Sequence, residues 1–181
     1  VTLREAIDKA QRSIPLVLNL KKVDGEGIDF SHLILRGSCL DQAKMRRCRF
    51  VGTDLSGALM IGANFDRCDL VGADLVDTDL TRAVFAHSFL SFADLRRSCL
   101  IEAVFRDTDL MGSVLWKANL WNTDISGAAH IKEKNFYDPS KPGNSKHACL
   151  LEKDAFTAFE AYRSVKHYFY HGEPAREGLD Y

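Results

Sequence analysis

The chain is 181 residues long, with 24 lysines and arginines against 25 aspartates and glutamates and a net charge of −1. This balance excludes a strong overall field, so we expect neither nucleic-acid binding through a basic surface nor imitation of nucleic acid by an acidic one. The length suits one domain with appendages. No apolar run long enough to span a membrane and no signal peptide are visible.

Residues 1–24 are predicted to cap the domain that follows them. Thr2 and Glu5 have the spacing of a capping box, which favours a short helix to about Arg12. Pro15 would end this helix. An alternation typical of a β-strand follows at Leu16, Leu18 and Leu20.

A five-residue repeat dominates the middle of the chain. Large apolar residues occupy every fifth position from Phe30 to Ile125, and a small residue usually lies two positions earlier. Neither a helix nor a strand keeps every fifth residue on one side, so the chain must turn a corner in each unit. Four equal corners close a coil of twenty residues. The twenty units therefore predict about five coils, with one interior column formed by Phe65, Phe85 and Phe105.

Several of these units resemble the A(D/N)LXX unit of the pentapeptide-repeat proteins, among them GANFD (62–66), GADLV (72–76), FADLR (92–96) and KANLW (117–121). The resemblance covers roughly residues 26–129. It implies an all-β solenoid, a right-handed quadrilateral β-helix of about five coils, which we place at residues 25–129. The resemblance indicates little about function, because members of this family have many different partners.

The period is lost after Ala129. Residues 130–152 are predicted to be a loop because they are rich in proline, glycine, serine and asparagine. Residues 153–181 are predicted to form a C-terminal α-helical segment. It resembles a helical hairpin found after the repeats of some larger members, some of which continue into membrane-spanning, ion-channel-like segments. Its apolar face would carry Phe156, Phe159, Tyr162, Val165 and Phe169.

The five cysteines are predicted to be free thiols. Cys48 and Cys68 lie one coil apart in the inward series of small residues, at a spacing that would permit a disulfide. We interpret both as small fillers of the interior. A reducing cytoplasm is the expected location, with a cytosolic domain of a membrane-associated protein as the alternative.

No catalytic, metal or cofactor site is predicted, and the chain is not expected to be an enzyme. Asp54, Asp74 and Asp94 stack in one outward column, where a ladder of carboxylates could hold a cation. The favoured interpretation is that each aspartate accepts a hydrogen bond within its own turn. His167 and His171 have the spacing of a zinc motif, but the intervening glutamate and a third ligand are missing.

Two outward surfaces are candidates for binding. The first is a stripe of apolar residues comprising Leu59, Ile61, Ile101, Trp116 and Trp121, interrupted by Cys99. The second is a basic patch comprising Lys44, Arg46, Arg47, Arg49 and Arg67. The favoured interpretation of these basic residues is a solvated charged rim, paired with the nearby Asp66 and Asp69; the alternative is a site for an acidic patch or phosphates.

These features predict a non-catalytic scaffold that mediates protein–protein interaction with an unknown partner, without nucleic acid, cofactor or membrane insertion of this chain. One alternative is a regulatory cytosolic domain of a larger membrane protein that continues beyond Tyr181. Another is the DNA-mimicking, gyrase-binding, quinolone-resistance branch of the family, which the balanced charge disfavours. The C-terminal helix is expected to cover the apolar stripe; the alternatives are that it caps the last coil or forms a dimer.

Overall fold

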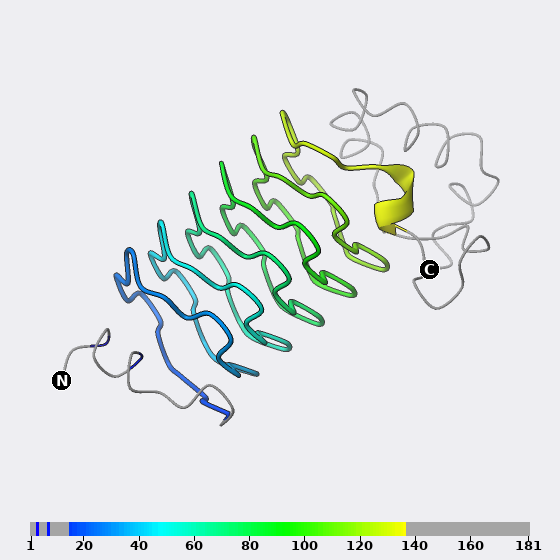
Figure 1. Cartoon of the computed structure of the whole chain (residues 1–181). Coiled ribbons are helices and arrows are strands. Elements are labelled where there is room, and N and C mark those ends of the chain that lie inside the picture. Colours follow the sequence, from blue (N-terminus) through cyan, green and yellow to red (C-terminus); the bar gives the residue numbers. More distant parts are fainter. Residues whose placement is uncertain (1–2, 4–6, 8–14, 137–181) are drawn as a thin grey trace.

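The computed structural model describes residues 3, 7 and 15–136, and these form a stack of flat coils with successive turns aligned in rows (Figure 1). Single-residue parallel bridges pair the coils from Pro15 to Ala129. From Asn19 onward each bridge joins a residue to the one twenty positions later. Within the described residues the only longer regular element is η1, a 3-10 helix at Glu133–Phe136.

Each five-residue unit repeats one pattern of backbone hydrogen bonds. The amide of Leu55 donates to the carbonyl of Asp74 at 2.8 Å, and the amide of Asp74 donates back to Thr53 at 3.0 Å. The amide of Ala58 donates to the carbonyl of Leu55 at 3.0 Å and closes a tight turn. Because a turn interrupts every unit, pairing between coils never extends into a continuous strand. Four such turns complete one coil, as the five-residue period predicted.

The third residue of every turn has a left-handed backbone. From Lys22 to Gly127 each fifth residue has a positive φ, as a type II turn requires. The glycines of this series adopt the conformation without strain. At the other corners the chain holds side-chain-bearing residues, of which Phe92, with φ of 60°, is the bulky aromatic one. Such a backbone costs a residue other than glycine about 1–2 kcal/mol.

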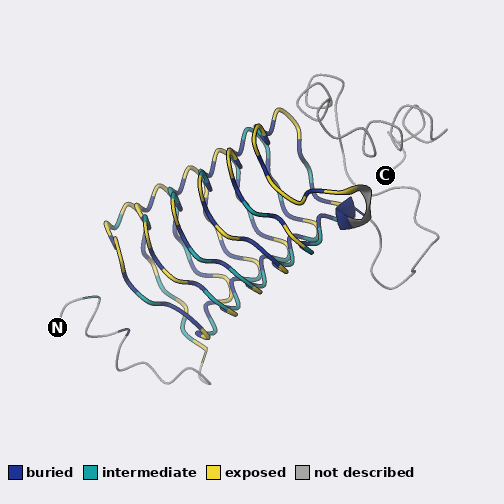
Figure 2. Ribbon diagram, turned by 45° about the horizontal axis from the view of Figure 1, so that its top comes forward, coloured by how far each residue is buried: buried dark blue, intermediate teal, exposed yellow. Residues whose placement is uncertain are grey.

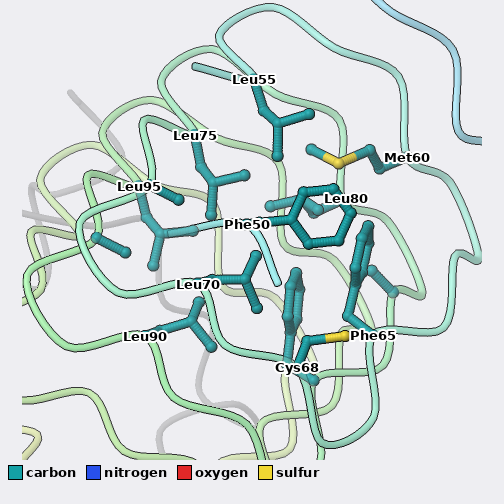
Figure 3. Packing of buried hydrophobic residues seen from close by; sticks show 14 of the residues in the cluster. Phe50, Leu55, Met60, Phe65, Cys68, Leu70, Leu75, Leu80, Leu90 and Leu95 are labelled. Carbon is teal, nitrogen blue, oxygen red and sulfur yellow. The ribbon is translucent and has the colours of Figure 1, made fainter. Parts of the chain in front are cut away.

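The interior is filled by the predicted columns of side chains (Figure 3). Every fifth residue from Phe30 to Ile125 is buried, with at most 1% of its surface exposed. Phe65 and Phe85 stack with ring centroids 5.1 Å apart, and Phe85 and Phe105 stack at 5.0 Å. The five-residue register is therefore confirmed. Its cause is geometric, since the narrow coil can hold one large inward side chain per straight segment, with a small one beside it.

The small residues beside these columns also make hydrogen bonds. Thr53 Oγ1 donates to the carbonyl oxygen of Phe30 at 2.9 Å, and Cys68 Sγ donates to that of Met45 at 2.7 Å. Both bonds reach back to the preceding coil, so these residues tie coils together as well as filling space. Cys39, Cys48, Cys68 and Cys99 are free thiols. Burial, together with the neighbouring Cys48, raises the pKa of the Cys68 thiol.

The ladder begins earlier than the boundary predicted at residue 25. Pro15 pairs with Ile34 and Asn19 pairs with Cys39, so the chain from Pro15 already forms part of a coil and not a separate strand. Leu20 is buried, whereas Val17 is 77% exposed. Of the predicted N-terminal helix the structure describes Leu3 and Ile7, and both pack against the core. The rest of that helix lies outside the described residues.

The other end of the stack is closed by η1, inside the segment predicted as a loop. Asn135 lies twenty residues after Leu115, and its carbonyl accepts the Leu115 amide at 2.6 Å. The Asn135 Nδ2 group donates to the carbonyl oxygens of Leu110, at 3.0 Å, and Ser113, at 2.8 Å. Phe136 is fully buried beside it. The predicted C-terminal helix and the remainder of the loop lie outside the described residues. In the described part of the chain no helix has the length and apolarity needed to cross a membrane.

Candidate interaction surfaces

The coil has four sides, and buried and exposed residues alternate along each of them (Figure 2). We number the sides by their interior columns. Face 1 lies outside Leu40, Met60, Leu80, Leu100 and Leu120, and face 2 outside Met45, Phe65, Phe85, Phe105 and Ile125. Face 3 lies outside Phe30, Phe50, Leu70, Leu90 and Leu110, and face 4 outside Leu35, Leu55, Leu75, Leu95 and Leu115.

The stacked aspartates serve their own turns. Oδ1 of Asp54 accepts the Ser56 amide at 3.1 Å, Oδ1 of Asp74 accepts the Val76 amide at 3.0 Å, and Asp94 repeats the contact with Arg96. The favoured interpretation of this column is confirmed. Among the described residues no three histidine, cysteine or acidic side chains are grouped as a metal site would require. The predicted histidine pair His167 and His171 lies outside those residues.

The aspartates on and beside face 4 are also paired with arginines, within one turn at Asp94 and across coils at Asp54 and Asp77. Arg36 binds Asp54, Arg96 binds Asp94, and Arg97 binds Asp77 at the corner. The hydrogen bond from Arg97 lowers the pKa of Asp77. Asp74 differs, because burial raises its pKa and the flanking carboxylates Asp54 and Asp94 raise it further. On face 4, arginines therefore neutralise the aspartates around Asp74, whereas the charged form of Asp74 itself is disfavoured.

The predicted basic patch lies mainly on face 2 and carries acidic partners. Arg46 and Arg47 both bind Glu26, with N–O distances of 2.8 and 3.2 Å. Arg49 lies 3.7 Å from Asp29. Arg67 lies 3.7 Å from Asp66, and Lys44 is exposed in the ladder between Asp24 and Asn64. The positive charge of this surface is thus largely balanced by neighbouring carboxylates.

The predicted apolar stripe runs along face 1 but is divided in two. Leu59, Ile61 and Trp121 are 46%, 37% and 38% exposed. Ile101 is half-buried. Between Leu59 and Cys99 the ladder passes through Asp79, whose carboxylate accepts the Thr81 hydroxyl at 2.7 Å. A polar middle coil therefore separates an apolar patch near the start of the rod from another near its end.

Trp116 does not belong to this stripe. It directly follows Leu115 and therefore lies on face 4, a corner away from Trp121. Its ring is half-buried against the core, and the Lys117 ammonium lies 4.7 Å from the ring centroid. Because of these two contacts, Trp116 offers less free apolar surface than its sequence position suggested.

Among residues 15–136, the phenylalanines, tyrosines and tryptophans with the most exposed side chains lie on face 3, where the sequence interpretation placed no site. Phe89 and Phe92 are 55% and 62% exposed, and Met111 is 43% exposed. Phe92 donates its amide to the Met111 carbonyl at 2.7 Å, so the two residues are adjacent. A signal was present, because Phe92 occupies a corner that glycine or a polar residue fills elsewhere. We call Phe89, Phe92 and Met111 the face 3 patch.

The repeats of this chain match a known family. The pentapeptide-repeats profile matches residues 48–86 and 88–127 in eight copies. The repeat region belongs to the pentapeptide-repeat family. The matched pentapeptide repeats all lie within the stretch from Pro15 to Ala129 that the bridges arrange into coils. No curated protein matches the sequence.

Solved structures of other pentapeptide-repeat proteins are similar to this chain. HetL from the cyanobacterium Nostoc sp. strain PCC 7120, described as involved in regulating heterocyst differentiation, aligns at 23% identity with a TM-score of 0.45, over 61% of this chain and 52% of HetL. The plasmid-mediated fluoroquinolone resistance protein QnrB1 aligns at 19% identity and a TM-score of 0.49, over 58% of this chain and 59% of QnrB1. Rfr23 from the cyanobacterium Cyanothece 51142 aligns at 19% identity with a TM-score of 0.39, over 61% of this chain and 82% of Rfr23. The alignment therefore spans little more than half the length of HetL and QnrB1.

Proposed function

We propose that this pentapeptide-repeat chain is a non-catalytic scaffold whose rod binds another protein. The observation that carries the proposal is the contrast between a filled interior and an exposed apolar exterior. The interior columns are buried completely, yet large apolar side chains project outward from face 1 and face 3. Exposed apolar patches on a folded protein commonly mark sites of interaction with another macromolecule.

The polar groups of the described rod support a binding role over a catalytic one. The aspartates of face 4 accept amide hydrogens from their own turns, and arginines neutralise most of them. A catalytic carboxylate needs a free position toward a substrate and a pKa matched to its task. Here the same groups maintain the turns and the stacking of coils. We also infer a right-handed coil and a cytoplasmic location, the latter supported by the free thiols Cys48 and Cys68.

The alternatives have less support. A DNA-mimicking surface needs unbalanced negative charge. In the described rod, Arg36, Arg96 and Arg97 each bind an aspartate, which removes that imbalance from face 4. A role as the regulatory domain of a membrane protein depends on sequence beyond Tyr181 and would be compatible with the same binding surfaces.

Site-specific photocrosslinking tests the scaffold proposal. A photoreactive residue is placed at position 61 on face 1, at 111 on face 3, or at 76 on face 4 as the matched control, in cells that express the native gene. We expect a defined crosslinked protein from position 61 or 111 and none from position 76. The proposal fails if neither apolar position yields a product that the control lacks.

A further inference from the structure

We propose that the face 3 patch is a docking site for a protein segment that presents an apolar side chain flanked by lysine or arginine. The inference rests on the proposed scaffold function and assigns it a place and a partner chemistry. Its three members, Phe89, Phe92 and Met111, are among the most exposed large apolar residues of the described chain.

The patch is held in a fixed shape by the ladder. Phe89 is bridged on both sides, to Asp69 in the preceding coil and to Asp109 in the following one. The Phe92 amide is bonded to the Met111 carbonyl at 2.7 Å. Each backbone segment beneath the patch is thus locked in place, and a partner that docks here need not order a flexible loop. Such preorganisation reduces the entropic cost of binding.

A phenylalanine at position 92 is unfavourable for the stability of the fold. Its φ of 60° is strained for a bulky residue, and the ring gains little burial in return, since 62% of its surface is exposed. The next corner in the same row is Gly112, and a Cβ added there would lie 2.7 Å from Cδ1 of Phe92. The glycine thus gives the ring room to lie along the rod with its outer side toward solvent. Strain kept at an exposed aromatic residue favours a role in recognition.

The charges around the patch select the partner. Asp69 and Asp109 lie in the ladder one coil before and one coil after Phe89, so an aspartate stands on each side of this residue. Asp109 also accepts hydrogen bonds from the His130 ring at 2.8 Å and from the Ser91 hydroxyl at 3.2 Å. Hydrogen bonds from His130 and from the Met111 amide lower the pKa of Asp109 against the opposing effect of burial. The lowered pKa keeps the Asp109 carboxylate negatively charged at neutral pH. A segment with a basic residue beside its apolar anchor would complement this arrangement.

The same charges disfavour a second copy of the chain as the occupant. In a symmetric dimer centred on Phe89, each surface meets itself in the reverse direction. The coil before Phe89 would then face the coil after it, which places Asp69 opposite Asp109 of the other copy. Like charges facing one another at an interface oppose association. A basic partner avoids this conflict.

The test uses two short synthetic peptides and the full chain. One peptide has a central tryptophan–leucine pair flanked by lysines; the other has glutamates in place of the lysines. Fluorescence anisotropy should show that the lysine peptide binds more tightly than the glutamate peptide, with a preference that weakens as salt increases. Phe92→Asn should weaken binding of the lysine peptide by about tenfold or more, as loss of a central anchor does. Asparagine tolerates the left-handed backbone, so this variant should fold at least as stably in a denaturant titration.

Two controls separate this site from other effects. Ile61→Thr on face 1 should leave peptide binding unchanged, whereas Met111→Gln should weaken it without involving a strained corner. Asp69→Asn should reduce the preference for the lysine peptide, because Asp109 alone then remains beside Phe89. Equal binding of both peptides, or unchanged binding by Phe92→Asn, would overturn the inference. It would also be overturned if sedimentation showed a dimer that Phe92→Asn dissociates. In either case, a specific crosslink from position 61 would leave the scaffold function standing.

Discussion

The rings of Phe65 and Phe85 lie almost parallel, 7° apart in plane and 5.1 Å apart in centroid, although twenty residues separate them in the chain. Phe85 also stacks on Phe105 in the next coil, so it is the middle member of a continuous column. Its removal would leave a void with an aromatic ring on each side, which the rigid coils cannot close.

We therefore expect Phe85→Ala to lower the free energy of unfolding by about 3–5 kcal/mol. Val76→Ser, on the outward side of face 4, should cost less than about 0.5 kcal/mol. Denaturant titrations of the two variants measure both effects. Equal losses would contradict the division into inward and outward positions.

The cysteines give a second prediction. Denatured protein that has not been reduced should react with a thiol reagent at all five cysteines. In the folded protein Cys68 should react slowly, because its thiol is buried and its raised pKa keeps it protonated. Protection of Cys48 and Cys68 in the denatured sample until a reductant is added would reveal a disulfide. Cys99, which is half-buried, provides the faster-reacting comparison in the folded state.

Replacing Asp74 with asparagine should raise the free energy of unfolding. Its pKa is raised by burial and by Asp54 and Asp94, so the folded state disfavours its charged form. Stability is therefore lost as the pH rises from the ordinary value of 3.8 through the raised folded-state pKa. Asp74→Asn removes the charge and retains an oxygen that can accept the Val76 amide. We expect a gain of up to about 1 kcal/mol at pH 7, discounted for solvent screening. The gain should shrink at acidic pH, where Asp74 itself becomes neutral. Thermal melts at pH 7 and pH 3.5 would show a constant difference if this explanation were incorrect.

Asp77 should behave in the opposite way. Its pKa is lowered by the hydrogen bond from Arg97, so it stabilises the folded state above the ordinary aspartate pKa of 3.8. That contribution is lost as the pH falls below 3.8 and through the lower folded-state value. Asp77→Asn should therefore be less stable than the parent at pH 6 and approach it at pH 2. A difference that persists unchanged at pH 2 would point to another cause. Melting temperature as a function of pH is the measurement.

Asn135 should control the end of the stack. Asn135→Ala removes the Nδ2 donor from the buried carbonyls of Leu110 and Ser113. The Leu110 carbonyl keeps the Ser113 hydroxyl as a donor, so the larger loss is at Ser113. Loss of such partners costs about 1–3 kcal/mol. Hydrogen exchange should quicken at the amides of the last coil, such as Leu115, and change little near Leu55. Uniform acceleration along the rod would argue against a local cap. Ser126→Ala, on an exposed turn of the same coil, is a matched control.

The sequence predicts the coils because every five-residue unit requires one large and one small inward side chain. Phe85 can be identified as an inward residue from the sequence alone, since inward positions recur every five residues and only the size of their side chains varies. Asn135 occupies the same row as Leu115, but a polar residue after the period has lapsed gives no sign that the stack continues. The division of the face 1 stripe by Asp79 was also readable in principle. It was missed because exposure had to be followed along the row and not along the chain.

Phe89 and Phe92 illustrate a different limit. Outward positions tolerate almost any residue, so the repeat pattern does not distinguish these two phenylalanines from other outward residues. The proposal for them depends on the coil, which places Met111 next to Phe92 and Gly112 where the Phe92 ring needs room. The pairing of the basic patch with Glu26 and Asp29 likewise depends on neighbours one coil away.

The twenty-residue offset of the bridges limits how such a gene can change in length. Inserting one residue would move every later inward side chain out of step, and the protein would fail to fold beyond that point. Inserting five would keep the interior filled but carry all later outward residues round to the next side, dispersing any surface assembled from several coils. Duplication of twenty would lengthen the rod and preserve each side. Lineages that must retain a binding surface should therefore gain and lose repeats in whole coils.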